Sequence, residues 1–306
     1  MSVTQACGLL SQTPAASTRS RGLDQTQRSI DTRAMTVTVS AFYKFVSIND
    51  CDALQSQIRN VLAAHAIKGT VLIASEGINA TVSGTDNAID GLHTWLSADP
   101  RFKGLSDKRS IAPDHPFQKL KVKIKPEIVT FGAADADPSR HVGTYVAPND
   151  WNALIENPDV IVVDTRNSYE VSIGTFPGAK DPGTRAFSEF PDFVDKHLAK
   201  SKDKPIAMFC TGGIRCEKAS AYLLSQGFPD VYHLEGGILK YLEVVPPAQS
   251  LWQGECFVFD DRVALEHGVK PGKHIRCVEC GDPISQKLAG SETGTTPMCA
   301  KCGSKI

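Results

Sequence analysis

One cysteine of this chain stands where a thiolate would be favoured, in Cys210-Thr211-Gly212-Gly213-Ile214-Arg215, directly after the apolar run Ile206–Phe209. The run predicts a buried strand, and the residues after the loop predict an amphipathic helix. A glycine-rich turn between them points successive backbone N–H groups into one concavity, and the helix dipole adds positive potential there. We therefore expect a lowered pKa for Cys210.

Two side chains at the end of the loop could take part in its chemistry. Arg215 can organise backbone carbonyls or face an anionic substrate. Cys216 could be a resolving thiol that forms a disulfide with Cys210, or a small residue packed in the first helical turn. Both interpretations of Cys216 stay open from the sequence.

Four further cysteines form two pairs near the C-terminal end, with eighteen residues between the pairs. Two C-x2-C knuckles at this spacing can offer four thiolates to one tetrahedral Zn²⁺. We predict a structural zinc ribbon, in which the metal replaces a hydrophobic core and could help to grip RNA. A redox-active or metal-free cluster is the alternative. The four residues are Cys277, Cys280, Cys299 and Cys302.

A short run of alternating lysines indicates a cationic surface. In the segment 119–125 the lysines alternate with Leu120, Val122 and Ile124, so a strand would place all of them on one face. Such a stripe can neutralise phosphates and position RNA without reading its sequence. The alternative is a merely solvated strand face. The lysines are Lys119, Lys121, Lys123 and Lys125.

The composition limits the class of protein. The chain has 306 residues, with Lys+Arg 33 against Asp+Glu 34, and 41% of its residues are apolar. At about 100–200 residues per domain this length predicts two or three domains. No stretch approaches the roughly 20 apolar residues of a membrane span, so we expect no membrane association. Nine cysteines without a secretory signal indicate a reducing compartment, and we predict a cytoplasmic protein.

The N-terminal half predicts a tail and one small domain. Residues 1–34 are rich in Ser, Thr, Gln and Arg and predict a disordered tail, which is either an extension upstream of a true start at Met35 or a transit peptide. Residues 35–131 predict strands at 37–46, 69–74, 80–83 and 120–124 and helices at 50–66 and 86–96. This β-α-β-β-α-β order is typical of a ferredoxin-like α+β domain, an antiparallel sheet with two helices on one face.

The rest of the chain predicts a linker and two further modules. Residues 132–144 contain a Gly, Ala, Asp and Pro-rich linker. Residues 145–246 predict helices at 148–156, 187–199 and 215–226 and short apolar strands at 160–164, 205–209 and 231–234, the pattern of a parallel sheet covered on both faces. Residues 247–306 form the small cysteine-rich module.

The Cys210 loop resembles the six-residue active-site loop of the rhodanese superfamily, in which a Cys-x4-Arg spacing fits a persulfide. Val163-Asp164-Thr165-Arg166 with Tyr169-Glu170, the segment 174–179 and Leu234-Glu235-Gly236-Gly237 resemble the superfamily's flanking motifs. The resemblance implies an α/β rhodanese domain with Cys210 as nucleophile or persulfide carrier. The alternative is a buried structural cysteine in an inactive rhodanese fold. It also implies structural ion-pair roles for Arg166 and Glu170, with acid/base chemistry as the alternative. Asp164, at the carboxyl end of a predicted strand, is expected to be structural, with a place in an active-site crevice as the alternative.

Longer segments resemble one family more specifically: the rhodanese-containing tRNA uridine(34) hydroxylases, which make 5-hydroxyuridine with molecular oxygen. This resemblance covers about residues 37–306 and implies tRNA, through its anticodon loop, as the partner, oxygen as co-substrate and an unidentified reductant. No flavin or NAD motif is recognised in the sequence. The segments are 74–84, 116–123, 234–243 and 254–264.

A chemical hypothesis accompanies this resemblance. Because uracil C5 is not electrophilic, we expect the sulfur of Cys210 to add to C6 and so make C5 reactive toward oxygen. Two alternatives remain: a sulfurtransferase that moves sulfur through a Cys210 persulfide, and a non-catalytic RNA-binding module.

Overall fold

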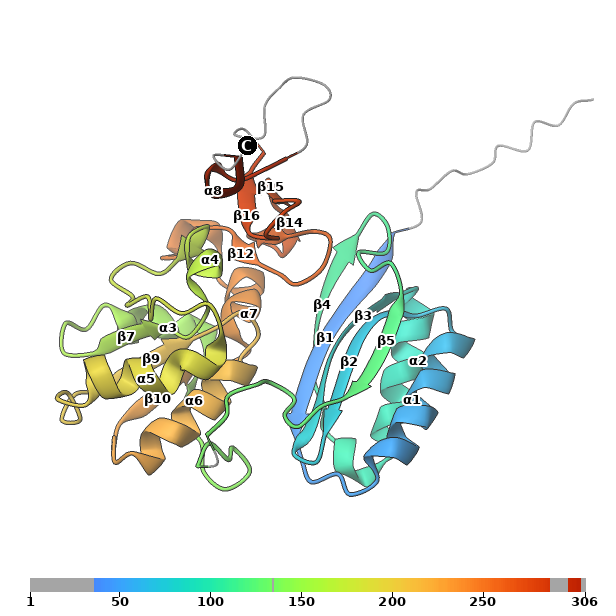
Figure 1. Ribbon diagram of the computed structural model, residues 1–306, viewed down its shortest axis with the longest axis horizontal. Helices are drawn as coiled ribbons and strands as arrows, with labels where there is room; N and C mark the ends of the chain where they lie inside the picture. The colour runs from blue at the N-terminus through green and yellow to red at the C-terminus, as the bar shows by residue number, and fades with distance from the viewer. Residues whose placement is uncertain (1–35, 134, 287–296, 304–306) are drawn as a thin grey trace, which may run out of the picture. The chain divides into compact units, whose positions relative to one another are not determined.

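The N-terminal part of the chain folds as a five-stranded sheet with two helices on one face (Figure 1). The computed structural model describes residues 36–133, 135–286 and 297–303. The predicted tail, residues 1–34, lies outside them. The elements are β1 (Val37–Phe45), α1 (Cys51–Ala64), β2 (Lys68–Ala74), β3 (Gly77–Gly84), α2 (Asp86–Ser97), the 3-10 turn η1 (Pro100–Phe102), β4 (Asp107–Ala112) and β5 (Leu120–Ile124).

The strand order β4-β1-β3-β2-β5 confirms the ferredoxin-like core and corrects its last strand. The prediction closed the motif with residues 120–124, but the closing strand is β4, which pairs antiparallel with β1. The segment 120–124 is a fifth strand, parallel to β2 on the other edge, so the sheet is mixed rather than antiparallel. Sequence patterning missed β4 because this edge strand carries Lys108, Arg109 and Ser110 in place of alternating apolar residues.

The two faces of this sheet have different environments. Apolar residues of the two helices, such as Ile58 of α1 and Leu92 of α2, belong to one buried cluster. The strands contribute Val71, Ile73 and Val122 to the same cluster. Because side chains alternate along a strand, the intervening residues point to the opposite, helix-free face. That face is therefore available to the rest of the molecule.

A second, four-stranded sheet follows, with all strands parallel in the order β6-β10-β9-β7. The predicted parallel sheet is confirmed, and β6 is a strand that the prediction missed because it has only three residues and none is buried. The elements are β6 (Thr144–Val146), α3 (Pro148–Ile155), β7 (Ile161–Asp164), α4 (Ser168–Val171), β8 (Gly174–Thr175), β9 (Ile206–Phe209), α6 (Ile214–Ser225), β10 (Val231–Leu234) and α7 (Gly237–Val244).

The single helix predicted over 187–199 is instead three short helical pieces. They are the 3-10 turn η2 (Phe187–Glu189), α5 (Phe190–Phe193) and the π-helical turn η3 (Val194–Leu198). Pro191 lies at the start of α5 and cannot donate a backbone hydrogen bond to the preceding turn, which separates η2 from α5.

The C-terminal module consists mainly of short strands and contacts both the first sheet and the parallel-sheet domain. Strand β11 (Gln253–Gly254) pairs with β8, and Arg262 donates to Ser110 of β4 at 2.6 Å. The 3-10 turn η4 (Pro247–Gln249) precedes β11. The remaining elements are β12 (Cys256–Phe257), β13 (Ala264–Glu266), β14 (Lys270–Pro271), β15 (His274–Arg276), β16 (Pro283–Ser285) and α8 (Ala300–Gly303).

An ion cluster around the buried Lys218 joins the first two domains. Lys218 of α6 is 2% exposed, lies 2.8 Å from Glu76 and also pairs with Glu127. The Glu127 carboxylate additionally accepts the backbone N–H groups of Phe131 and Gly132 at 2.9 and 3.0 Å. Since α6 directly follows the Cys210 loop, these contacts fix that loop relative to the first sheet.

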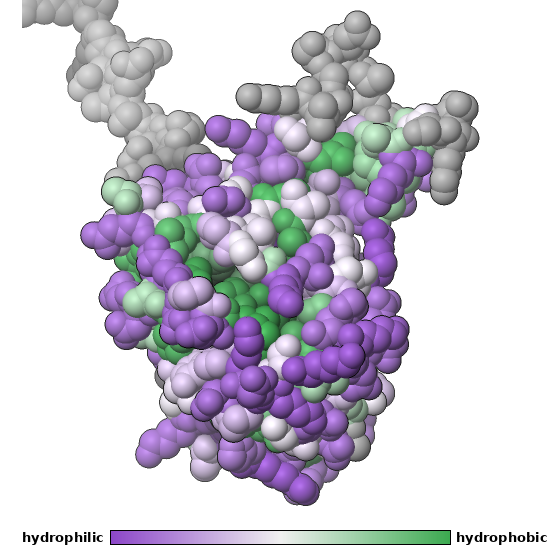
Figure 2. Space-filling model, turned by 90° about the vertical axis from the view of Figure 1, so that its left-hand side faces the viewer, coloured by the Kyte–Doolittle hydropathy of each residue, from purple (hydrophilic) through white to green (hydrophobic). Residues whose placement is uncertain are grey.

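The surface carries both hydrophobic and hydrophilic side chains. On the face in Figure 2, hydrophobic side chains gather toward the middle and hydrophilic ones surround them. Within the described ranges, no helix has the length and apolar character needed to cross a membrane.

Candidate functional site

The predicted active-site loop lies between β9 and α6, as expected. All four residues of β9 are buried, and so is Cys210 immediately after it. Gly213 has φ +102°, a left-handed conformation that suits glycine, and its N–H donates to Cys210 Sγ at 3.1 Å. The loop therefore turns at least one backbone donor toward the sulfur.

The environment of Cys210 favours the thiolate. Burial alone raises the pKa of this thiol, but a hydrogen bond from Cys216, the positive charge of Arg215 and the backbone N–H groups of Cys216 and Gly213 outweigh burial and lower the pKa to about 5. The direction of this shift agrees with the expectation from the loop sequence.

The Cys216 thiol is one of the groups that lower the pKa of Cys210. Its own pKa lies well above the usual value, because of burial and because Cys210 holds both a hydrogen bond and a negative charge beside it. Its sulfur also lies 3.6 Å from Thr165 Oγ1. The structure therefore adds a third interpretation to the two drawn from the sequence: an S–H donor that stabilises the neighbouring thiolate.

Arg215 is held by a carboxylate. Its Nη1 and Nη2 donate to Glu170 Oε2 and Oε1 at 2.7 and 2.8 Å, and Nη2 also reaches Thr211 Oγ1 at 3.2 Å. Burial raises the pKa of Glu170, but the charge of Arg215 and its hydrogen bonds reverse this and keep the pKa below its usual value. The guanidinium therefore acts on Cys210 through its charge while its donors are occupied by Glu170.

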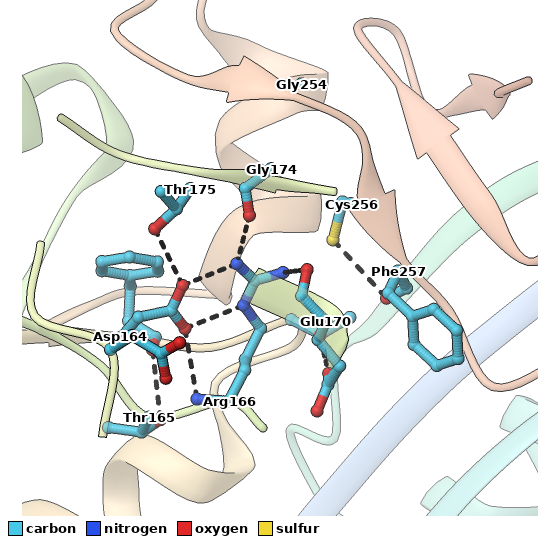
Figure 3. Close-up of polar contacts among 12 residues, drawn as sticks. Asp164, Thr165, Arg166, Glu170, Gly174, Thr175, Gly254, Cys256 and Phe257 are labelled. Carbon is cyan, nitrogen blue, oxygen red and sulfur yellow. Dashed lines mark hydrogen bonds and ion pairs between the residues drawn. The ribbon is translucent and has the colours of Figure 1, made fainter. Parts of the chain in front are cut away.

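A second buried ion pair joins Arg166 to Asp164, and Arg166 Nη1 also donates to the backbone carbonyl of Glu170 at 3.4 Å (Figure 3). Arg166 Nε and Nη2 donate to Asp164 at 2.8 and 2.6 Å, and both side chains are fully buried. Thr175 donates to the same Asp164 carboxylate at 2.9 Å. This pairing accords with the structural roles that the resemblance implied.

The loop forms one wall of a cavity of about 560 Å³. The helix-free face of the first sheet forms the opposite wall, and the C-terminal module contributes a third. The lining residues include Cys210, Thr211, Gly212, Ile214 and Arg215 from the loop, Ala41, Tyr43, Thr70, Leu72 and Lys108 from the sheet, and Val258, Phe259 and Arg262 from the C-terminal module.

Tyr43 and Lys108 are site residues that the sequence did not single out. Tyr43 Oη donates to Glu217 at 2.6 Å. It also packs closely against Gly213, because a Cβ built at position 213 would lie 2.8 Å from this oxygen. Burial lowers the pKa of Lys108, while the charges of Cys210 and Glu217 oppose this effect.

The four predicted lysines lie at the edge of the same sheet face. They are exposed, and Lys121 and Lys123 are the register partners of Thr70 and Leu72, two cavity-lining residues. Partners in a parallel pair point to the same side of the sheet. Lys119 and Lys125 flank β5, and none of the four lines the cavity itself. The stripe thus continues the cavity wall outward.

The four C-terminal cysteines come together as predicted. Their sulfur atoms all lie within 4.8 Å of one another, and the Cys280 and Cys299 sulfurs are 3.7 Å apart. Tetrahedral bonds of about 2.3 Å require sulfur separations near ~3.8 Å. The residues therefore fit a metal ion with four thiolate ligands, in a cluster separate from the Cys210 cavity.

Comparisons with known proteins agree with the two-domain core. Residues 37–128 match the family model described as a UPF0176 acylphosphatase like domain, and residues 147–243 match the rhodanese-like domain. A protein of Picosynechococcus sp. named "tRNA uridine(34) hydroxylase" is 56% identical over 85% of this chain and 89% of its own length. One of Rhizobium etli with the same name is 51% identical over 86% of each chain. A solved rhodanese-like domain protein from Staphylococcus aureus is 27% identical over 32% of this chain and 90% of that chain, with a TM-score of 0.27.

Replacing Cys216 with alanine tests the origin of the low pKa. A hydrogen bond to a charged group contributes roughly 1.5–3 kcal/mol, and one pKa unit corresponds to about 1.4 kcal/mol. Loss of the S–H donor should therefore raise the pKa of Cys210 from about 5 by roughly one to two units. The measurement is the pH dependence of iodoacetamide alkylation, followed on the Cys210 peptide by mass spectrometry.

The matched control is Cys51→Ala, because Cys51 lies at the start of α1 and does not line the cavity. An unchanged alkylation midpoint in Cys216→Ala would contradict the assignment of Cys216 as the donor.

Proposed function

We propose that this chain, which belongs to the tRNA uridine(34) hydroxylase family, converts uridine 34 of tRNA to 5-hydroxyuridine with molecular oxygen as co-substrate. The observation that carries the proposal is the Cys210 thiolate in the wall of a cavity of about 560 Å³. That volume is in the usual range for small-molecule sites. A wobble nucleotide can enter it because the anticodon loop is single-stranded and its bases can be splayed out.

Cys210 is the proposed nucleophile. Its Sγ attacks C6 of the uracil ring, and the electron pair of the C5=C6 bond moves toward C5 and O4. C5 then becomes electron-rich and can accept an oxygen atom. After loss of the C5 proton, Sγ leaves C6 and the double bond is restored, so that the thiolate is regenerated.

The remaining loop residues have supporting roles in this proposal. Gly213 N–H and the Cys216 thiol stabilise the sulfur anion when it departs, and Arg215 keeps the local potential positive. In the net reaction, one oxygen atom of O₂ enters C5 and the other becomes water. This consumes two protons and two electrons from an external two-electron reductant.

Sulfur transfer is the second candidate. The Cys-x4-Arg loop and the rhodanese-like domain match support a Cys210 persulfide as well as a carbon adduct. Cys216 would resolve such a species or an oxidised Cys210 in either reaction. A non-catalytic RNA-binding role is weaker, because it leaves the low pKa of Cys210 without a use.

We also propose the module boundaries 35–131, 145–246 and 247–306, and a cytoplasmic location. Every cysteine in the described ranges is a free thiol, which suits a reducing compartment.

The reaction is tested by nucleoside mass spectrometry on tRNA incubated with the protein, a reductant and ¹⁸O₂. We expect 5-hydroxyuridine that carries one ¹⁸O atom. Cys210→Ala should lower its rate by at least about 10³-fold because the nucleophile is lost, whereas Cys51→Ala should have no effect. Product formed without oxygen, or at an unchanged rate by Cys210→Ala, would refute the mechanism. No hydroxylation together with thiocyanate formation from thiosulfate and cyanide would favour sulfur transfer.

The lysines are proposed to hold the tRNA backbone at the entrance to the cavity. Each phosphate contact changes the slope of log Kd against log salt by about 1. The double variant Lys121→Ala/Lys123→Ala should therefore bind tRNA more weakly and lower the slope by about 2. The control is Lys200→Ala, because Lys200 is exposed and does not line the cavity. Equal salt slopes in the double variant and the wild type would show that these lysines do not contact phosphates.

Zinc is the proposed metal of the four-cysteine cluster. Four thiolates suit Zn²⁺ in a closed structural site, where the ion would hold β15, β16 and α8 together. We expect about one zinc ion per purified chain by elemental analysis, and a strong loss of zinc in Cys280→Ser/Cys302→Ser but not in Cys51→Ser. A metal-free wild-type chain, or a double variant that keeps its zinc, would refute this assignment.

A further inference from the structure

Phe259 is an exposed aromatic residue in an unusual position. Its side chain is 63% exposed, while Phe257, two residues earlier, is 1% exposed. A single exposed apolar side chain needs no explanation by itself. Among the large hydrophobic residues that are exposed in the described part of the chain, however, Phe259 is the one that lines the cavity with Cys210.

The ring is held in place although it is exposed. Its edge-to-face partner is the buried Phe257, with ring centroids 5.2 Å apart. The next residue, Asp260, is 3% exposed and accepts hydrogen bonds from Arg262 at 2.6 and 2.8 Å. The backbone N–H of Val258 donates to the carbonyl of Val263 at 2.8 Å. The positions on both sides of Phe259 are therefore fixed, which limits the entropy lost when a ligand binds.

The ring lies beside the active-site loop, where a flat ligand in the cavity would meet it. The guanidinium carbon of Arg215 lies 5.9 Å from the ring centroid, so the ring borders the active-site loop. Lys108 and Arg262 line the same cavity. A nucleobase from a single-stranded anticodon loop is a planar group that can stack on an exposed aromatic ring at this position.

We propose that Phe259 is the stacking platform for the base of nucleotide 34 and that it positions this base beside the Cys210 loop. This inference rests on the proposed function, because that function supplies the base. Stacking is tolerant of base identity, since every base has a flat face. Phe259 therefore contributes affinity and position, and the choice of uracil is made by other groups.

A double-mutant cycle between the protein and the RNA tests this assignment. The ligands are three fluorescein-labelled tRNA anticodon stem-loops that differ only at position 34, which holds uridine, cytidine or an abasic sugar. The full chain is used as wild type, Phe259→Ala, Phe259→Tyr and Ile111→Ala, and Kd is measured by fluorescence anisotropy. Ile111 is a matched control because it is 62% exposed and does not line the cavity.

The expected result is specific to the base. Phe259→Ala should weaken binding of the uridine and cytidine stem-loops by similar factors, about 5- to 150-fold, and leave binding of the abasic stem-loop unchanged. Phe259→Tyr should stay within about twofold of wild type, because its ring still stacks. Ile111→Ala should change none of the three.

Three outcomes would overturn the inference. The first is an equal loss on the abasic stem-loop, which would trace the effect to folding or to phosphate contacts. The second is no loss on the uridine stem-loop. The third is a wild-type chain that binds the uridine and abasic stem-loops equally, which would mean that the base at position 34 does not stack on the protein.

Failure of the proposed function has a different signature. If the cycle gives the expected pattern but no 5-hydroxyuridine forms, the platform stands and the reaction is wrong. If the wild-type chain binds no stem-loop, the proposed substrate is wrong and the platform falls with it.

Discussion

A buried negative charge is the constraint on which the site depends. Cys210 is fully buried, and burial by itself would keep its sulfur protonated. The charge is stabilised only because the Gly213 N–H, the Cys216 thiol and the Arg215 guanidinium act on the same atom. A Cβ at position 237 would lie 2.5 Å from the Cys210 carbonyl oxygen. Gly237, shortly after β10, is therefore required for the backbone to pass this close to the loop. The thiolate is thus a property of the loop together with its neighbours.

Arginine placement follows from the same constraint. A buried guanidinium must itself be paired, and Glu170 meets this need with two hydrogen bonds of 2.7 and 2.8 Å. Glu170 in turn caps α4 by accepting the Asn167 N–H at 3.1 Å, so the ion pair is tied to the backbone after β7. Because Arg215 pairs with Glu170, the proposed function requires other groups to neutralise the phosphates of the tRNA. The exposed lysines on β5 are well placed for this, since they share a sheet face with cavity-lining residues.

Features encoded by residues close together in the sequence could be predicted, and features that depend on contacts between distant residues could not. The Cys210 loop and the paired cysteines are encoded by short spacings, and both come together as expected. The strands with apolar alternation were also predictable. Strand β4 was not predictable, because its residues are mostly polar. Two of them, Lys108 and Ser110, face a cavity that the strand shares with the other parts of the chain. Tyr43 was missed for the same reason: its hydroxyl bonds Glu217, 174 positions away in the chain. Such contacts are products of tertiary structure and leave no local pattern.

Three parts of the chain build one cavity, and this division explains why the loop alone does not define the substrate. The loop supplies a stabilised sulfur anion, which suits sulfur transfer as well as addition to a pyrimidine. The opposite wall comes from a sheet that the Lys218–Glu76 pair and the Tyr43–Glu217 hydrogen bond fix against α6. A small sulfur donor would need no such wall, and a stripe of lysines at its edge would be without a function. In the proposed function, the first domain and the C-terminal module therefore select the large anionic substrate, and the rhodanese-like domain supplies the chemistry.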